Sequence, residues 1–108
     1  MKVRIENQEV RFRLSEEEKS LLKSGSMISA HLIYGEGILN SQSFTILVSK
    51  QVDKITLDST NGIFEILFPV DYAGVWNDDK VGFEEIIHIA DCDDLKVIVE
   101  KDLMKRRK

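Results

Sequence analysis

Hydrophobic and polar residues alternate strictly over two segments at the start of the chain, residues 2–6 and 9–14. Every second residue is Val, Ile, Phe or Leu, and the positions between them carry Lys, Arg or Glu, except at the turn. A period of two residues is typical of strands that bury one face. The two segments therefore predict a β-hairpin with Asn7 and Gln8 at its turn.

Two short segments predict helices. Ser15 begins a run of three glutamates, and Glu18 follows it at the third position, which is the sequence of a capping box at a helix N-terminus. We expect this helix to end at Gly25, because glycine readily adopts the left-handed conformation found there. Pro69 predicts the start of a second helix, since its fixed φ suits the first helical position. The spacing of the apolar residues that follow places Trp76 on the buried side of this helix.

The rest of the chain predicts strands in pairs, separated by turn residues. Gly35 and Gly37 lie in the loop of one predicted hairpin, and Asn61-Gly62 predicts a type I′ turn in the next. β-Branched and aromatic residues concentrate in three pairs of segments: 26–34 with 43–49, 54–58 with 63–68, and 81–90 with 95–100.

The order ββ-α-ββ-ββ-α-ββ favours an α+β fold that is mostly antiparallel β, with about eight strands as successive hairpins and two short helices. We predict a single domain over residues 1–103 and a basic C-terminal tail at 104–108. No internal sequence repeat is recognisable. A curved sheet, a sandwich and an open barrel remain alternatives.

The register of the first hairpin gathers four cations on one face. Arg4 lies opposite Arg11 in this register, and directly opposed like charges are unfavourable unless negative charge lies nearby. Acids of the chain itself are one source, with Asp58 and Glu65 of the third hairpin as candidates, and an anionic partner is the other. The predicted binding residues are Lys2, Arg4, Arg11 and Arg13.

The last predicted hairpin is partly apolar on both faces. With residues 91–94 as its loop, Ile86, His88 and Ala90 share a face with Leu95. A strand pair of this kind needs a cover on each side. We expect the helix that starts at Pro69 to supply it, and a homodimer interface is the alternative.

Composition places the chain among ordinary globular proteins. Its 108 residues are 43% hydrophobic and 31% charged, and they include no long apolar run and no signal-like start. We therefore expect a cytoplasmic protein without membrane contact. A net charge of -4 argues against a general nucleic-acid binder. Cys92 is the single cysteine, which excludes an internal disulfide.

Catalytic chemistry has one weak candidate, a metal-dependent site built from His88, Asp91 and Cys92. The loop lacks the glycine of an EF-hand, because Lys96 stands at the sixth position. We predict a polar hairpin loop with no catalytic residue, no metal and no cofactor. The four cations of residues 105–108 suggest a nucleic-acid-associated regulator as a further alternative, although no aromatic residues are interleaved with them.

Several stretches resemble an uncharacterised family of short bacterial proteins. They are residues 1–5, residues 10–15 with Glu18, the segment from Pro69 through Trp76 to 81–84, and 99–103. The resemblance covers most of the chain and implies no assigned activity. From the residues themselves we predict a non-catalytic binding or regulatory domain. Its basic hairpin face would contact an acidic protein partner or a small anion.

Overall fold

The structure is a computed structural model that describes residues 1–36, 41–60 and 62–102. Within these residues the chain forms eight strands and two short helices, which confirms the predicted α+β class. In chain order the elements are β1 (Lys2–Glu6), β2 (Glu9–Leu14), α1 (Glu16–Lys23), β3 (Ile28–Ile33), β4 (Ser41–Ser49), β5 (Thr56–Asp58), β6 (Phe64–Pro69), α2 (Val70–Val75), β7 (Gly82–Ile87) and β8 (Leu95–Lys101).

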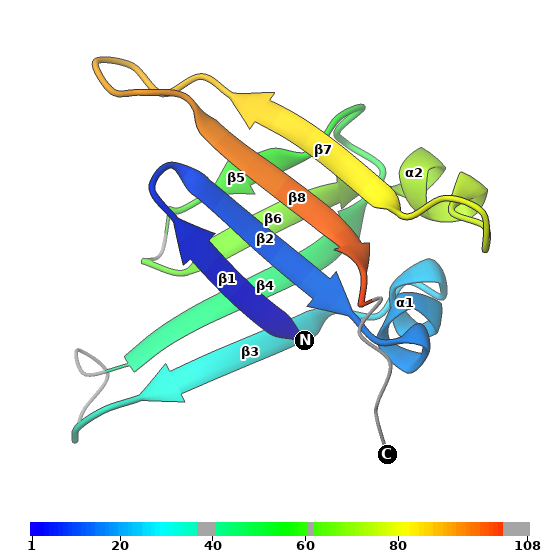
Figure 1. The fold of residues 1–108 in the computed structure, drawn as a ribbon, viewed down its shortest axis with the longest axis horizontal. Helices are drawn as coiled ribbons and strands as arrows, with labels where there is room; N and C mark the ends of the chain where they lie inside the picture. Colours follow the sequence, from blue (N-terminus) through cyan, green and yellow to red (C-terminus); the bar gives the residue numbers. More distant parts are fainter. Residues whose placement is uncertain (37–40, 61, 103–108) are drawn as a thin grey trace.

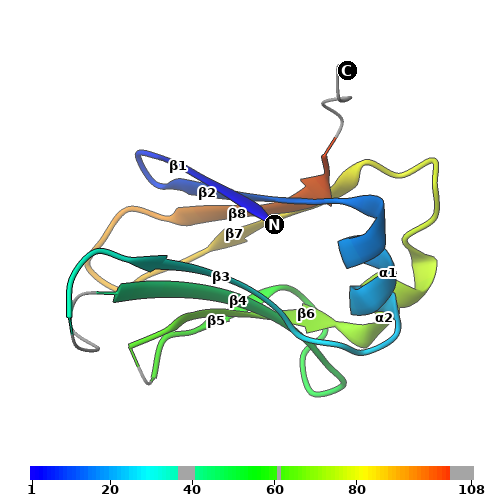
Figure 2. The same ribbon diagram turned by 90° about the horizontal axis from the view of Figure 1, so that it is seen from below.

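The strands form two four-stranded sheets that face each other. One sheet has the order β1-β2-β8-β7 and the other the order β3-β4-β6-β5 (Figure 1). Figure 2 shows the two sheets as stacked layers, with α1 and α2 side by side at one end. Among the predicted alternatives, the chain therefore adopts the sandwich.

The centre of each sheet is parallel, whereas its outer pairings are antiparallel. β2 pairs in parallel with β8, and β4 pairs in parallel with β6. The predicted hairpins account for the antiparallel pairings on either side of these strands. The sheets are thus mixed, because hairpins from distant parts of the chain join at the centre of each one.

The two halves of the chain repeat the same order of elements. The first half contributes β1, β2, α1, β3 and β4, and the second contributes β5, β6, α2, β7 and β8. Each sheet combines one hairpin from each half. If the strands of the first half are exchanged with the corresponding strands of the second half, the strand order of one sheet becomes that of the other. The fold therefore has an approximate internal two-fold symmetry that no sequence repeat reveals.

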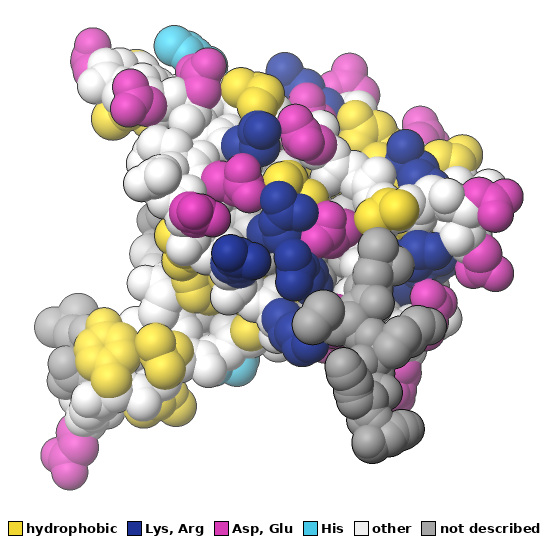
Figure 3. Space-filling view, viewed as in Figure 1, with side chains coloured by type: hydrophobic (Ala, Val, Ile, Leu, Met, Phe, Trp, Pro, Cys, Tyr) yellow, Lys and Arg dark blue, Asp and Glu magenta, His cyan; other side chains and the backbone are white. Residues whose placement is uncertain are grey.

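The first hairpin has the predicted register. Arg4 pairs with Arg11, and Asn7 adopts a positive φ of 54° at the turn. The odd-numbered positions of β1 and the even-numbered positions of β2 face the other sheet, so the cations face outward. Figure 3 shows Lys and Arg side chains gathered over β1, β2 and β8, with carboxylates among them.

The predicted capping box at the start of α1 is confirmed. The Glu18 N–H donates to the Ser15 hydroxyl at 3.1 Å, and the Ser15 N–H donates to the Glu18 carboxylate at 3.0 Å. Gly25 follows the helix with a φ of +94°, as predicted for a left-handed C-terminal residue. The Met1 ammonium also donates to the Glu18 carboxylate, which ties the start of β1 to α1.

Glu18→Gln is expected to lower the free energy of unfolding at pH 7 by about 1 kcal/mol, because Gln keeps the capping interaction but loses the ion pair. Burial opposes ionisation of Glu18, yet hydrogen bonds from the Met1 ammonium and Ser15 outweigh it and lower the pKa of this carboxyl. A lowered pKa stabilises the fold above the pKa of the unfolded chain, and this stabilisation is lost as the pH falls through the folded pKa.

Urea denaturation between pH 7 and pH 3 measures this effect. The difference between wild type and Glu18→Gln should shrink as the pH falls. Exposed Glu17 offers a control, since Glu17→Gln makes the same change of charge one residue away. A difference between wild type and Glu18→Gln that is independent of pH would contradict the assignment.

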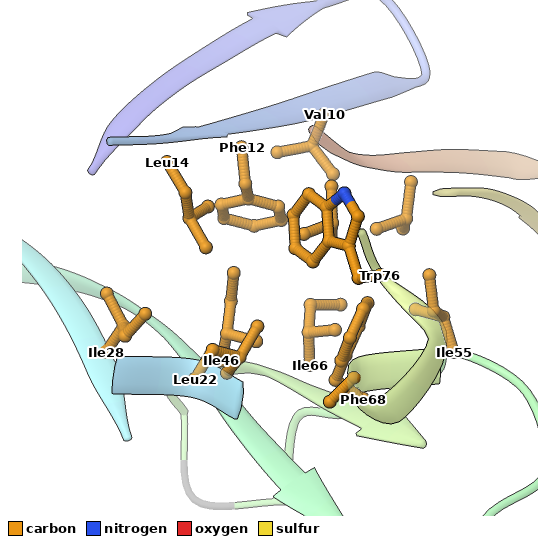
Figure 4. Packing of buried hydrophobic residues seen from close by; sticks show 13 residues of the cluster. Val10, Phe12, Leu14, Leu22, Ile28, Ile46, Ile55, Ile66, Phe68 and Trp76 are labelled. Atoms are coloured by element: carbon orange, nitrogen blue, oxygen red, sulfur yellow. The ribbon is translucent and has the colours of Figure 1, made fainter. Parts of the chain in front are cut away.

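The core lies between the two sheets. Figure 4 shows Val10, Phe12 and Leu14 pointing from β2 toward the opposite layer, with Trp76 among the side chains between them. Trp76 is fully buried, and its indole N–H donates to the Lys80 carbonyl at 2.9 Å. This agrees with the predicted buried position of Trp76. The remaining core residues include Leu22, Ile28, Ile46, Ile55, Ile66, Phe68, Ala73, Val97 and Val99.

Two lysines of α1 bind the C-terminal end of α2. Lys23 Nζ donates to the Ala73 and Trp76 carbonyls at 3.1 and 2.7 Å. Lys19 is 4% exposed, and its Nζ donates to the Asn77 carbonyl at 3.2 Å. Lys23 thus supplies a partner for the Trp76 carbonyl just after the helix end, whereas the Ala73 and Asn77 carbonyls also accept from the Trp76 and Lys80 N–H groups. The start of α2 also differs from the prediction by one residue, because Pro69 is the N-cap and the last residue of β6.

The predicted register of the last hairpin is wrong. Leu95 pairs with Ile87 rather than Ala90, and residues 88–94 form the loop. This shift of three residues is odd, so it exchanges the two faces of β7. Ile86 therefore points outward and is 49% exposed, whereas Phe83 packs against the core.

The cover of this strand pair also differs from the prediction. The opposite sheet covers its inner face, where α2 contributes Tyr72, whose ring stacks on Phe83 at 4.7 Å. On the outer face Ile98 is 8% exposed. It lies between its strand neighbours Arg11 and Glu84 at the centre of this face.

Candidate binding site

The four predicted binding residues occupy neighbouring positions on the outer face of the sheet that contains β1. Arg11 and Arg13 lie on the inner strand β2, and Lys2 and Arg4 lie on the edge strand β1. The structure therefore brings the four cations together as the hairpin register predicts. Their partners and exposure divide them into an inner and an outer pair.

The inner pair is held by carboxylates from two strands. Arg11 donates to both oxygens of Glu100 on β8 at 3.1 and 3.2 Å and to Glu9 at 2.9 Å. Arg13 Nε donates to the same Glu100 carboxylate at 3.0 Å. The hydrogen bonds that Arg11 donates to Glu9 and Glu100 raise the pKa of this guanidinium, although its partial desolvation opposes the shift. Glu9 and Glu100 together neutralise the inner cations.

The outer pair is more open. Lys2 and Arg4 are each 65% exposed at the side chain. Lys2 Nζ lies 2.7 Å from an Asp102 carboxylate oxygen, and Arg4 lies 3.8 Å from the exposed carboxylate of Glu6. The Arg4–Glu6 pair is exposed on both sides and contributes little free energy, so Arg4 can exchange partners at low cost. Lys2 is held by a carboxylate that is only 17% exposed.

The acids predicted to neutralise the hairpin are the wrong ones. Asp58 and Glu65 do lie opposite each other, as predicted, but on β5 and β6 of the other sheet. Asp58 accepts hydrogen bonds from the Thr60 hydroxyl and N–H, which lower the pKa of its carboxyl. Glu100 takes the neutralising role because the parallel pairing of β2 with β8 places it beside Arg13.

Comparison with models of known families matches residues 1–107 to a family of unknown function, DUF7009. The chain belongs to this family. The expected membership of an uncharacterised family is thereby confirmed. Comparison with curated proteins and with solved structures finds no match.

The alternative site of this DUF7009 member lies in the loop between β7 and β8. His88 Nδ1 lies 3.1 Å from an Asp94 carboxylate oxygen, and both side chains are largely exposed. Cys92 is exposed in the same loop, and Asp91 has a positive φ of 62°. Over residues 1–36, 41–60 and 62–102, the structure contains no cluster of three or more His, Cys, Asp or Glu side chains arranged to hold a metal ion.

Two other predictions concern the basic tail with two predicted turns and the absence of membrane contact. The basic tail at 104–108, together with Gly37 and Asn61 of two predicted turns, lies outside the described residues. In the part of the chain that is described, neither helix has the length and apolar character that crossing a bilayer requires.

Proposed function

We propose that the chain is a non-catalytic binding domain whose first hairpin contacts an acidic protein partner. The observation that carries the proposal is the exposure of Lys2 and Arg4 on an edge strand, where each side chain is 65% exposed. An acidic surface that approaches β1 meets both cations without rearranging the sheet. Such charges guide association and select partners.

The inner cations have a different role in this proposal. Arg11 and Arg13 are less than a third exposed and share the Glu100 carboxylate. Separating them from Glu100 would leave opposed like charges on neighbouring strands. We therefore assign partner contact to Lys2 and Arg4, and stabilisation of the β1-β2-β8 surface to Arg11 and Arg13.

A binding assay with neutralised outer cations tests this proposal. The probe is a fluorescein-labelled peptide of glutamate residues, and its binding is followed by fluorescence anisotropy. The titration is done at about 50 and about 200 mM salt, because screening of exposed charges increases between these concentrations. The double variant Lys2→Gln and Arg4→Gln is expected to bind about fivefold more weakly, as two exposed ion pairs would allow. The fold should persist, because both side chains are exposed.

The matched control is the double variant Lys50→Gln and Lys54→Gln. Both lysines are exposed and lie between β4 and β5, away from the hairpin, and the net charge changes by the same amount. This control should bind the probe as the wild type does. Equal weakening by the two double variants, or absence of binding to the wild type, would refute the proposal.

A further inference from the structure

An apolar groove runs between the two sheets along the edges formed by β1 and β3. It is the space between the outermost strands of the two sheets and has a volume of about 430 Å³. Its walls are mostly apolar, and Ile5 and Leu32 are 63% and 61% exposed. The apolar side chains of the lining are Met1, Val3, Ile5, Ala30, Leu32 and Phe44.

The internal symmetry shows why the groove is open at this edge. Under this internal symmetry, Glu85 of β7 occupies the position that is equivalent to Ala30 of β3. At the β5–β7 edge the Glu85 carboxylate accepts from the Ile55 N–H at 3.2 Å and from the Tyr72 hydroxyl at 3.4 Å. Ile55 is 1% exposed there. The methyl group of Ala30 is too short to form an equivalent bridge, so the β1–β3 edge stays open.

The backbone of β1 offers a second feature of the same edge. Within the part of the chain that the structure describes, β1 is the outermost strand of its sheet, with β2 on one side only. In an antiparallel pair, alternate residues direct their N–H and C=O groups away from the neighbouring strand. The two-residue turn at Asn7 and Gln8 makes Val3 and Ile5 these residues. An extended chain can pair with them, as in recognition by strand addition.

We propose that the groove binds an extended segment of the acidic partner, in which acidic residues alternate with apolar ones. The segment adds to the free edge of β1. Its apolar side chains enter the groove beside Ala30 and Leu32, and its acidic side chains lie on the outer face beside Lys2 and Arg4. This inference rests on the proposed function and specifies the form of the partner.

Charge favours such a segment over a second copy of β1. The antiparallel register that pairs the whole of β1 with a second copy sets Lys2 opposite Glu6 at both ends but still sets Arg4 opposite Arg4 at the centre. A segment with alternating acids instead places a carboxylate beside each cation.

The experiment compares two labelled peptides of equal composition by fluorescence anisotropy. One alternates glutamate with valine, and the other carries all its glutamates before all its valines. The alternating peptide can present one acidic and one apolar face to β1, whereas the block peptide cannot. It should bind wild-type protein about tenfold more tightly, the factor expected for one well-placed apolar anchor.

Two groove variants separate this inference from the proposed function. Ala30→Phe fills the groove, and Leu32→Asp adds a charge at a side chain exposed enough for the fold to tolerate it. Each should weaken binding of the alternating peptide about tenfold and leave binding of the block peptide unchanged. The Lys2→Gln and Arg4→Gln double variant should weaken both peptides. Circular dichroism confirms that each variant is folded.

Three outcomes would overturn the inference. The first is equal binding of the alternating peptide by wild type and both groove variants. In that case the proposed function still holds if the Lys2→Gln and Arg4→Gln double variant binds the peptide more weakly. The second is failure of both peptides to bind, which also refutes the proposed function. The third is dimerisation in sedimentation velocity that Leu32→Asp abolishes, since the groove would then hold a second copy.

Discussion

Trp76→Ala is expected to lower the free energy of unfolding by about 3–5 kcal/mol, which is a large part of the stability of a small domain. The indole is fully buried between the sheets. Its ring packs edge-on against Phe83 at 5.4 Å and at a tilt against Phe68 at 6.0 Å. Lys19 Nζ lies over it at 5.4 Å. Removing the ring leaves a cavity bordered by side chains from β6, β7 and α1, which no single one of these elements can close.

Thermal and urea denaturation followed by far-UV circular dichroism measure this loss, since the variant lacks the tryptophan needed for fluorescence. We expect the melting temperature to fall by about 15 °C or more. Trp76→Phe provides the graded comparison, because it keeps an aromatic ring but removes the indole N–H that binds the Lys80 carbonyl. A Trp76→Ala variant with wild-type stability would show that the core is assembled differently.

Gly82→Ala is expected to destabilise the domain by about 2–3 kcal/mol, because the added methyl group has no space. Gly82 begins β7 and pairs with Glu100 of β8. A Cβ at Gly82 would lie 2.3 Å from the Val99 carbonyl oxygen and 2.6 Å from Glu100 Cα. Both atoms belong to the backbone of β8, so β7 has to move away from its neighbour. The substitution therefore disturbs the pairing of β7 with β8, the strand that contains Glu100.

Gly74→Ala is the matched control for this substitution. Gly74 lies in α2, and a Cβ there meets no atom within 4 Å. Alanine favours a helix over glycine, so this variant should gain about 0.5–1 kcal/mol. Urea denaturation of both variants measures the contrast. Similar stability for Gly82→Ala and Gly74→Ala would contradict the close approach of β7 to β8.

Local patterns in the sequence were sufficient to predict the first hairpin and the start of α1. Strict alternation on both sides of Asn7 and Gln8 determines the first hairpin register, because a slip by one residue would turn Val10 and Phe12 outward. Ser15 and Glu18 form the predicted capping box with atoms only three residues apart. Both predictions depend on interactions within short stretches of chain.

Long-range pairing was not predictable in the same way. The parallel contact of β2 with β8 joins residues from opposite ends of the chain, such as Arg13 and Glu100. No local period reports this neighbour, so Glu100 was missed as the acid that holds the inner cations. The last hairpin failed for a related reason. Both faces of its strands carry apolar residues, and a pattern of that kind specifies register weakly.

The groove is a further feature that sequence reasoning missed. Its walls come from the edges of two different sheets, and the pairing order of those sheets decides that β1 lies near β3. The available signal was the small side chain of Ala30 between the larger side chains of Ile28 and Leu32, which alternate with it along β3. It acquires meaning only by comparison with Glu85, through a symmetry that the residues themselves do not display.

Chemical-shift mapping tests the central claim most directly, since it reports where an acidic segment contacts the protein. The measurement titrates the alternating glutamate–valine peptide into ¹⁵N-labelled protein and follows the backbone amides. The account predicts that the largest changes fall on β1 and the facing part of β3, led by the amides of Val3 and Ile5. Changes centred on the loop at 88–94 or on β5 and β6, with β1 unaffected, would contradict it.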